Sequence, residues 1–412
     1  MTTTVGAIEH LQRRTMLVLV VMQVIGMIGV GAAPSVGILL ATEVTQNEAI
    51  AGLARSSSTL GAALMGLPLG SLAARRGRRV ALTLGWYVAA AGAALLVFAA
   101  QFSLVVPLFI GLFAIGAGTA AGLQSRFAAT DLAPVAGRGR ALALVVWVGT
   151  LGSVLGPNLG VPGEWLHDRI GINVFGGAFG IAAVCLALAA TVVWIWLRPD
   201  PLVTLQARAG VSTVPGAQRP RLGQALAEVR RSGPGRLALV GILVGQSVMV
   251  AVMTMTPVHL AHHGDTITVI GLTISLHVAA MYVFAPLVGW CVDRLGHRVT
   301  IAIGVALLAA ACLVGAAWQH ETAAIVTALG LLGVGWSFTS VASSALFSVA
   351  VSDAHRAQAQ GGADALSNLC AAVAAFASGP LMAASDFSVL SLDALVLLVP
   401  LAVLLVPRRA TG

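Results

Sequence analysis

The segment Gly70–Arg79 reads GSLAARRGRR, and a similar segment, GWCVDRLGHR, returns 219 residues later at Gly289–Arg298. A second pair of segments keeps the same offset, because GLFAIGAG begins at Gly111 and GLLGVGWS begins at Gly330. Two pairs at one offset indicate that the chain is a duplicated unit. In membrane proteins this kind of duplication is typical of transporters with a substrate site between the repeats.

The composition is that of a polytopic membrane protein. Of 412 residues, 58% are hydrophobic and only 9% are charged, with a mean hydropathy of +0.94. A helix needs about 20 apolar residues to cross the bilayer core, and the apolar runs here are too long for barrel strands. We therefore predict an all-α integral membrane protein with twelve transmembrane helices in two pseudosymmetric six-helix halves. The expected spans are 15–41, 49–73, 80–100, 103–125, 141–162, 174–197, 237–260, 267–291, 299–318, 322–346, 357–384 and 389–407.

The domain organisation follows from the gap between the two sets of spans. We expect an N-terminal half at 1–197, a cytoplasmic linker at 198–236 and a C-terminal half at 237–412. The linker has no apolar run, and its segment around Leu222–Arg231 suits a helix lying on the membrane surface.

The arginines predict the orientation. With both termini in the cytoplasm, only Arg55 and Arg169 fall on the outside, and the other loop arginines fall inside. We therefore expect a multi-pass protein of the bacterial inner membrane. The net charge of +8 comes from these loop arginines, so we expect the lipid bilayer and not a nucleic acid as the partner.

The repeated arginine-rich segments resemble the cytoplasmic loop signature of the major facilitator superfamily, G-x-L-x-D-R-x-G-R-R. The second copy keeps the acid as Asp293, whereas the first has Ala74 at this position. The resemblance covers the whole chain and implies a monomer that transports by alternating access. We expect these segments, with Arg126 and Asp131, to form a cytoplasmic gate. The gate residues are Gly70, Arg75, Gly77, Arg78, Arg126, Asp131, Asp293, Arg294 and Gly296.

Two pairs of side chains in the C-terminal half suggest a metal site. Met249 and Met253 in the seventh span, and His277 and Met281 in the eighth, are each spaced i, i+4 and so share one face of a helix. Thioether and imidazole groups suit a soft cation such as Cu(I). The alternative is that the methionines fill gaps in helix packing and the histidine is a hydrogen-bonded structural residue.

The same four residues resemble the pattern of the CcoA-type bacterial copper importers within the superfamily. The resemblance implies copper import for cytochrome oxidase assembly, with copper as the transported substrate and not as a catalytic cofactor. It also implies a copper chaperone as a partner on the cytoplasmic side. This subgroup includes members that move organic solutes such as riboflavin, so the cargo stays open.

Other polar residues near or within the spans are candidates for accessory roles. We interpret His259, His262, His263 and Asp265 as an external capture site; the alternative is a polar turn that faces water. Several residues are candidates for the cavity lining, although interhelical hydrogen bonds are the commoner role of such side chains. These candidates are Met22, Met27, Asn158, Gln246, Asp364 and Asn368.

The fifth span favours a rival function. Its sequence GSVLGPNLGV, from Gly152 to Val161, resembles the Gly-Pro signature of proton-coupled exporters, although small residues also allow close helix packing. The arginine typical of those exporters is missing before Gly116, where Leu112 and Phe113 stand. The rivals are a proton-coupled transporter of an organic solute, either a riboflavin-like metabolite or an exported drug, and a copper sensor or assembly factor without flux. No nucleotide-binding loop or catalytic triad appears, so we expect secondary transport and no enzyme.

Overall fold

A computed structural model describes residues 2–134, 138–209, 229–351 and 356–406. Within these ranges the regular structure is entirely helical, and twelve helical segments are long and apolar enough to cross a membrane. The predicted all-α class with twelve spans is therefore confirmed.

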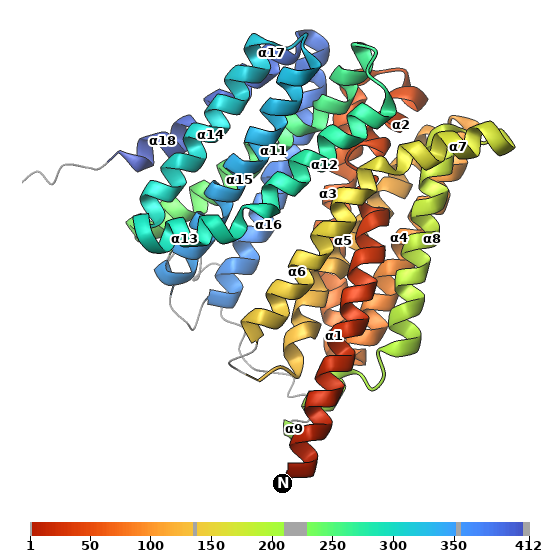
Figure 1. The fold of residues 1–412 in the computed structure, drawn as a ribbon, viewed down its shortest axis with the longest axis vertical. Helices are drawn as coiled ribbons and strands as arrows, with labels where there is room; N and C mark the ends of the chain where they lie inside the picture. The colour runs from red at the N-terminus through yellow and green to blue at the C-terminus, as the bar shows by residue number, and fades with distance from the viewer. Residues whose placement is uncertain (1, 135–137, 210–228, 352–355, 407–412) are drawn as a thin grey trace, which may run out of the picture. The chain divides into compact units, whose positions relative to one another are not determined.

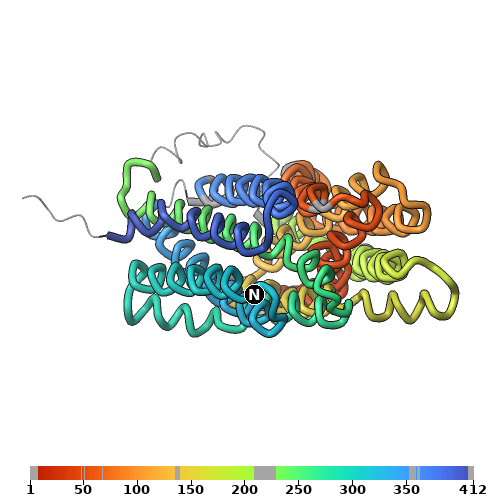
Figure 2. Tube along the Cα trace, turned by 90° about the horizontal axis from the view of Figure 1, so that it is seen from above, coloured from red at the N-terminus to blue at the C-terminus, as the bar shows by residue number. Residues whose placement is uncertain are grey.

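The chain divides into two compact units, each a bundle of long helices (Figure 1, Figure 2). The N-terminal unit comprises Met1–Gln46 and Ser57–Ala217, and the C-terminal unit comprises Asn47–Ser56 and Gln218–Gly412. The helix α3 contributes its first residues to the C-terminal unit and the remainder to the N-terminal unit. The first helices are α1 (Thr2–Gly31), α2 (Val36–Thr45), α3 (Glu48–Arg76), α4 (Arg78–Phe102), α5 (Val105–Asp131), α6 (Arg138–Leu155), the 3₁₀ turn η2 (Gly156–Leu159), α7 (Gly160–Ile170), α8 (Val174–Trp196) and α9 (Pro201–Ala209). The later helices are α11 (Gly233–His262), α12 (Ile267–Val283), α13 (Ala285–Leu295), α14 (His297–Ala317), α15 (Thr322–Ala350), α16 (Arg356–Ala384), α17 (Phe387–Val396) and α18 (Val399–Leu405).

Several element boundaries differ from the expected spans. The first span is longer than expected and consists of two helices, α1 and α2, joined by a turn at residues 32–35. The linker begins with a helix, α9, that the sequence pattern did not predict. Of the surface helix expected around Leu222–Arg231, residues 222–228 lie outside the described part of the chain.

The Gly-Pro motif of the fifth span mediates close packing between α1 and α6. A Cβ atom at Gly156 would lie 2.5 Å from Cα of Gly31, so only glycine fits where the two backbones meet. The motif also interrupts the span, because the 3₁₀ turn η2 replaces the α-helix at Pro157. The motif therefore has the packing role that its small residues allow, and a role in proton coupling stays a prediction.

The two copies of the arginine-rich segment have the same backbone geometry. Gly77 precedes α4 with φ +91°, and Gly296 precedes α14 with φ +82°. Their side-chain contacts differ. In the first copy Nε of Arg78 lies 2.9 Å from Oδ2 of Asp131, and the Arg79 backbone N–H donates to Asp200. This ion pair supplies the N-terminal unit with a charge contact despite Ala74.

In the second copy, by contrast, Arg298 donates to the backbone carbonyls of Leu404 and Leu405 at the end of α18. The two halves therefore share a backbone turn but stabilise it with different partners.

This difference predicts unequal effects of the same substitution. Both glycines combine positive φ with extended ψ, at 168° for Gly77 and 161° for Gly296, a conformation that costs a residue with a Cβ atom about 1–3 kcal/mol, so both Gly77→Ala and Gly296→Ala should destabilise the protein. At Gly77 a Cβ atom would also collide with the Asp200 carboxylate, whereas at Gly296 it would meet open space. We expect Gly77→Ala to lower the melting temperature in detergent more than Gly296→Ala does. Equal losses would contradict the Asp200 contact.

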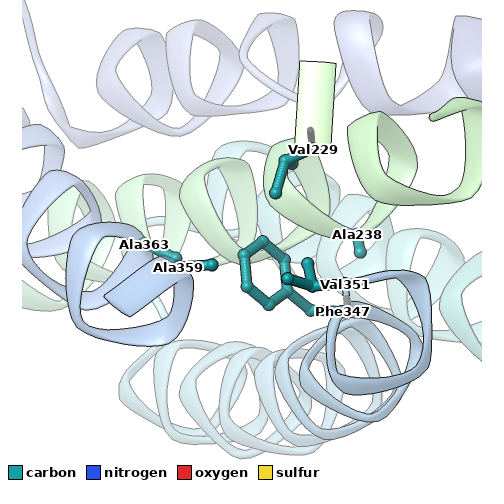
Figure 3. Close-up of a cluster of buried hydrophobic side chains, with 6 residues drawn as sticks. All are labelled: Val229, Ala238, Phe347, Val351, Ala359 and Ala363. Carbon is teal, nitrogen blue, oxygen red and sulfur yellow. The ribbon is translucent and has the colours of Figure 1, made fainter. Parts of the chain in front are cut away.

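A buried apolar cluster holds one end of the C-terminal unit together (Figure 3). Phe347 of α15, which is 1% exposed, lies between Ala238 of α11 and Ala359 and Ala363 of α16. Because interiors are close-packed, this cluster fixes how α15 sits against α11. The candidate site depends on how far α11 and α15 are shifted along each other, because its residues are positioned by both helices.

Candidate functional site

The candidate metal ligands lie on α11 and α12 of the C-terminal unit, beside α15. Short connections reverse the chain direction at each step, so α11 runs antiparallel to α15, and α12 runs parallel to it (Figure 1). Ser232 caps α11 and Thr266 caps α12, each with a side-chain oxygen that accepts a backbone N–H. Both α11 and α12 pack on α15.

His277 is fully buried, at 0% exposure, and its two ring nitrogens have different environments. Nδ1 lies 2.8 Å from the Leu329 carbonyl oxygen of α15, so Nδ1 carries the proton and donates it. Nε2 therefore keeps its lone pair, and it has no hydrogen-bond partner among the described residues. This close approach needs a glycine, because a Cβ atom at Gly333 would lie 2.5 Å from the His277 carbonyl oxygen.

A hydrogen bond between α11 and α15 sets the position of Met253 along the helix axis relative to α15. The Trp336 indole N–H donates to Oε1 of Gln246 over 2.8 Å. Met253 follows Gln246 by seven residues, or about 10.5 Å along the helix axis. On antiparallel α15 the same step leads from Trp336 to Leu329, the residue that binds His277. Met253 and His277 therefore lie at about the same height.

The other two ligand candidates, Met249 and Met281, lie one helical turn away along the helix axes. Met249 follows Gln246 by three residues. On antiparallel α15 the same step leads from Trp336 to Gly333, so Met249 and Gly333 lie at the same level along the helix axes. Met281 lies four residues beyond His277 on α12 and reaches the same height as Gly333. All four side chains are buried, with Met249 at 3%, Met253 at 5% and Met281 at 7% exposure. The register thus places the four residues within one helical turn of each other along the helix axes.

An arginine that the sequence pattern assigned to the outside belongs to this part of the molecule. Arg55 of α3 is half-buried within the C-terminal unit and interacts electrostatically with His277 and Tyr282. The Tyr282 ring in turn packs edge-on against Trp336, with 5.9 Å between the centroids. The sequence offered one signal for this contact, a charged residue near the start of an apolar span.

The residues interpreted as a capture site separate into different environments. His259 is buried, with Nε2 2.7 Å from the Gln319 carbonyl oxygen and its ring stacked on Phe387. The Asp265 carboxylate accepts a hydrogen bond from Thr322. Both side chains therefore have partners within the C-terminal unit, and their role in capture stays a prediction. His262 and His263 are exposed.

Most of the candidates for cavity lining are engaged with their own unit. The Trp86 indole lies 2.7 Å from the sulfur of Met22, which is fully buried, so Met22 belongs to the core of the N-terminal unit. Met27 lies against Gly152, and the Asn158 amide donates to the Val154 carbonyl oxygen.

In α16 the amide of Asn368 donates to the carbonyl oxygen of Asp364, so these two residues share a face as expected. A buried polar residue that the sequence pattern missed is Gln23 in α1, which accepts a hydrogen bond from Ser125 in α5.

The gate candidates lie at the ends of their helices. Arg126 donates a hydrogen bond to the Leu123 carbonyl oxygen of its own helix. Asp131 forms an ion pair with Arg78. Gly70 lies against Gln124, and Arg75, Asp293 and Arg294 are exposed.

Comparisons with known proteins agree on the architecture. The Major Facilitator Superfamily profile matches residues 16–266 and 237–412. The MFS-type transporter YddS of Bacillus subtilis is 36% identical over 94% of this chain and 89% of its own length. The riboflavin transporter RfnT of Brucella anthropi is 30% identical over 97% of this chain and 98% of its own.

Solved structures of transporters have the same fold. The nucleoside transporter NupG aligns with a TM-score of 0.74 at 16% identity over 96% of this chain and 98% of its own. A bacterial homologue of the lysosomal transporter Spinster aligns with a TM-score of 0.69 at 15% identity over 96% of this chain and 95% of its own.

Proposed function

The chain belongs to the major facilitator superfamily, so it is a membrane transporter and not an enzyme, and we propose that it imports copper as Cu(I). In this proposal Met249, Met253, His277 and Met281 bind the ion, and alternating access releases it on the other side of the membrane. The arginine distribution supports a bacterial inner-membrane protein with both termini in the cytoplasm. A cytoplasmic copper chaperone would accept the ion there for oxidase assembly.

The observation that carries this proposal is the state of His277. Its Nδ1–H donates to a backbone carbonyl, and its buried Nε2 lone pair has no partner among the described residues. Ligand histidines in metal sites are held in the same way, with the second ring nitrogen hydrogen-bonded to a carbonyl or carboxylate. An unpartnered buried polar atom is costly unless a ligand satisfies it.

The surrounding groups suit a transported ion better than a stored one. Three thioethers and one imidazole are soft, neutral ligands, so they hold Cu(I) without compensating its charge. Arg55 adds a positive charge near His277, which raises the free energy of a bound cation. Both features weaken binding and therefore favour release.

A second candidate cargo is an organic solute, and two observations favour it. One is the similarity to the riboflavin transporter RfnT. The other is the group formed by Gln246, Trp336 and Tyr282 with Arg55 nearby, which offers ring stacking, an amide and a positive charge. Such a set suits a planar heteroaromatic ring with polar edges. In this case the methionines would line an apolar cavity.

Ligand-dependent stabilisation distinguishes the two cargoes. A ligand at 100 times its Kd stabilises a protein by about 2.7 kcal/mol. We expect Cu(I), delivered from a weak chelator under reducing conditions, to raise the melting temperature of the purified protein. Riboflavin should leave it unchanged. The reverse result would reject copper as the cargo and support the organic solute.

A further inference from the structure

Two histidines from distant parts of the chain meet at one end of the C-terminal unit. Nε2 of His263, just after α11, lies 3.1 Å from Nδ1 of His320, between α14 and α15. Their ring centroids are 5.4 Å apart, and both side chains are exposed. His263 was a candidate from the sequence, and His320 was not.

The ring of His263 is held in one orientation. Its Nδ1 lies 2.9 Å from the His259 carbonyl oxygen, so Nδ1 carries the proton and Nε2 keeps a lone pair directed at His320. His259 is itself fixed, because it binds the Gln319 carbonyl oxygen and stacks on Phe387. A histidine with its second nitrogen on a backbone carbonyl is oriented as metal-binding histidines are.

The distance between the two facing nitrogens fits a shared metal ion. With metal–nitrogen bonds of about 2.0–2.1 Å, adjacent ligands lie about 3.3 Å apart in a tetrahedral site and about 2.8 Å apart in a square-planar one. The observed 3.1 Å falls between these values. Two-coordinate linear geometry would require about 4 Å, so the pair suits a dication with further ligands better than linear Cu(I). Binding needs the exposed His320 to carry its proton on Nε2 instead of Nδ1, and the two rings to turn so that both lone pairs point at one ion beside the line that joins the nitrogens.

The local charge also favours a cation. The carboxylate of Asp386, which caps α17, interacts electrostatically with His320. The backbone N–H of Val389 holds the pKa of Asp386 below its ordinary value, so this carboxylate is ionised at neutral pH. Gln319 links the two segments through its amide, which lies 3.3 Å from Asp386. Glu321 follows His320 directly in the sequence.

We propose that His263 and His320 form a second metal site, exposed to solvent and distinct from the Met/His group, which takes a borderline transition-metal dication such as Zn²⁺ with water completing its shell. Such ions prefer imidazole and carboxylate to thioether ligands. The site therefore does not depend on copper being the transported substrate.

Zn²⁺ titration of the full chain tests this site. The protein should be purified in detergent without a polyhistidine tag and titrated calorimetrically. We expect one Zn²⁺ per chain, and a loss of affinity of at least about tenfold in both His263→Ala and His320→Ala. His262→Ala is the matched control, because His262 is also exposed and lies next to His263, and it should bind normally.

Two further outcomes separate this site from the transport site. His277→Ala should keep full Zn²⁺ affinity, even if it abolishes copper transport. Zn²⁺ binding that is absent from the intact chain, or that survives both His263→Ala and His320→Ala, would overturn the proposal. A loss in His262→Ala equal to that in His320→Ala would also contradict the pair as assigned.

Discussion

Met253→Leu is expected to abolish copper uptake, whereas Met255→Leu on the same helix should leave it near the level of the intact chain. Leucine conserves the volume of methionine and removes only the thioether, so the fold should tolerate both changes. Both residues are buried, at 5% and 0% exposure, but only Met253 lies on the face of α11 that carries Gln246 and Met249. Loss of one metal ligand should lower uptake at least about tenfold.

The measurement is initial uptake of radioactive copper at matched expression in cells without their own importer. Equal uptake by the two variants would show that the thioether of Met253 is not a ligand. Met249→Leu should behave as Met253→Leu does, because its side chain lies one turn away on the same face.

Gly333→Val should have the second-largest effect, on both stability and transport. The added side chain would collide with the His277 backbone and ring, which would push α12 away from α15 and break the hydrogen bond to Leu329. Overpacking of this kind costs about 1–3 kcal/mol. We expect a lower melting temperature in detergent and a loss of copper uptake.

Gly330→Val is the matched control on the same helix. A Cβ atom at Gly330 meets nothing within 4 Å, so this substitution should change stability by less than about 0.5 kcal/mol and preserve uptake. If Gly333→Val transported copper as well as Gly330→Val does, the close contact between α15 and His277 would not matter for the site.

The fold was accessible from the sequence because hydropathy and repetition are local signals. A run of about 20 apolar residues specifies a span by itself, and the offset between Gly77 and Gly296 reveals the duplication. The structure gives these two glycines the same positive-φ backbone, at φ +91° and +82°. The break at Pro157 was less accessible, because proline can bend a helix or interrupt it, depending on its neighbours.

The environment of the site was only partly accessible, because it depends on contacts between helices far apart in the chain. The spacing of His277 and Met281 predicted a shared helix face, but it gave no information about Leu329, which fixes the imidazole. The interaction of Arg55 with His277 and Tyr282 was not accessible, because charge statistics assign an arginine to one side of the membrane and give no information about its partners. His320 lies 57 residues from His263, so no local pattern indicated the pair.

Copper import through His277 can be measured as copper uptake by the intact chain and by His277→Ala, compared at equal expression in cells that lack their own importer. We expect uptake well above the vector control for the intact chain and none above that control for His277→Ala. Uptake that survives in His277→Ala would contradict the site, and no uptake by the intact chain would contradict copper import itself.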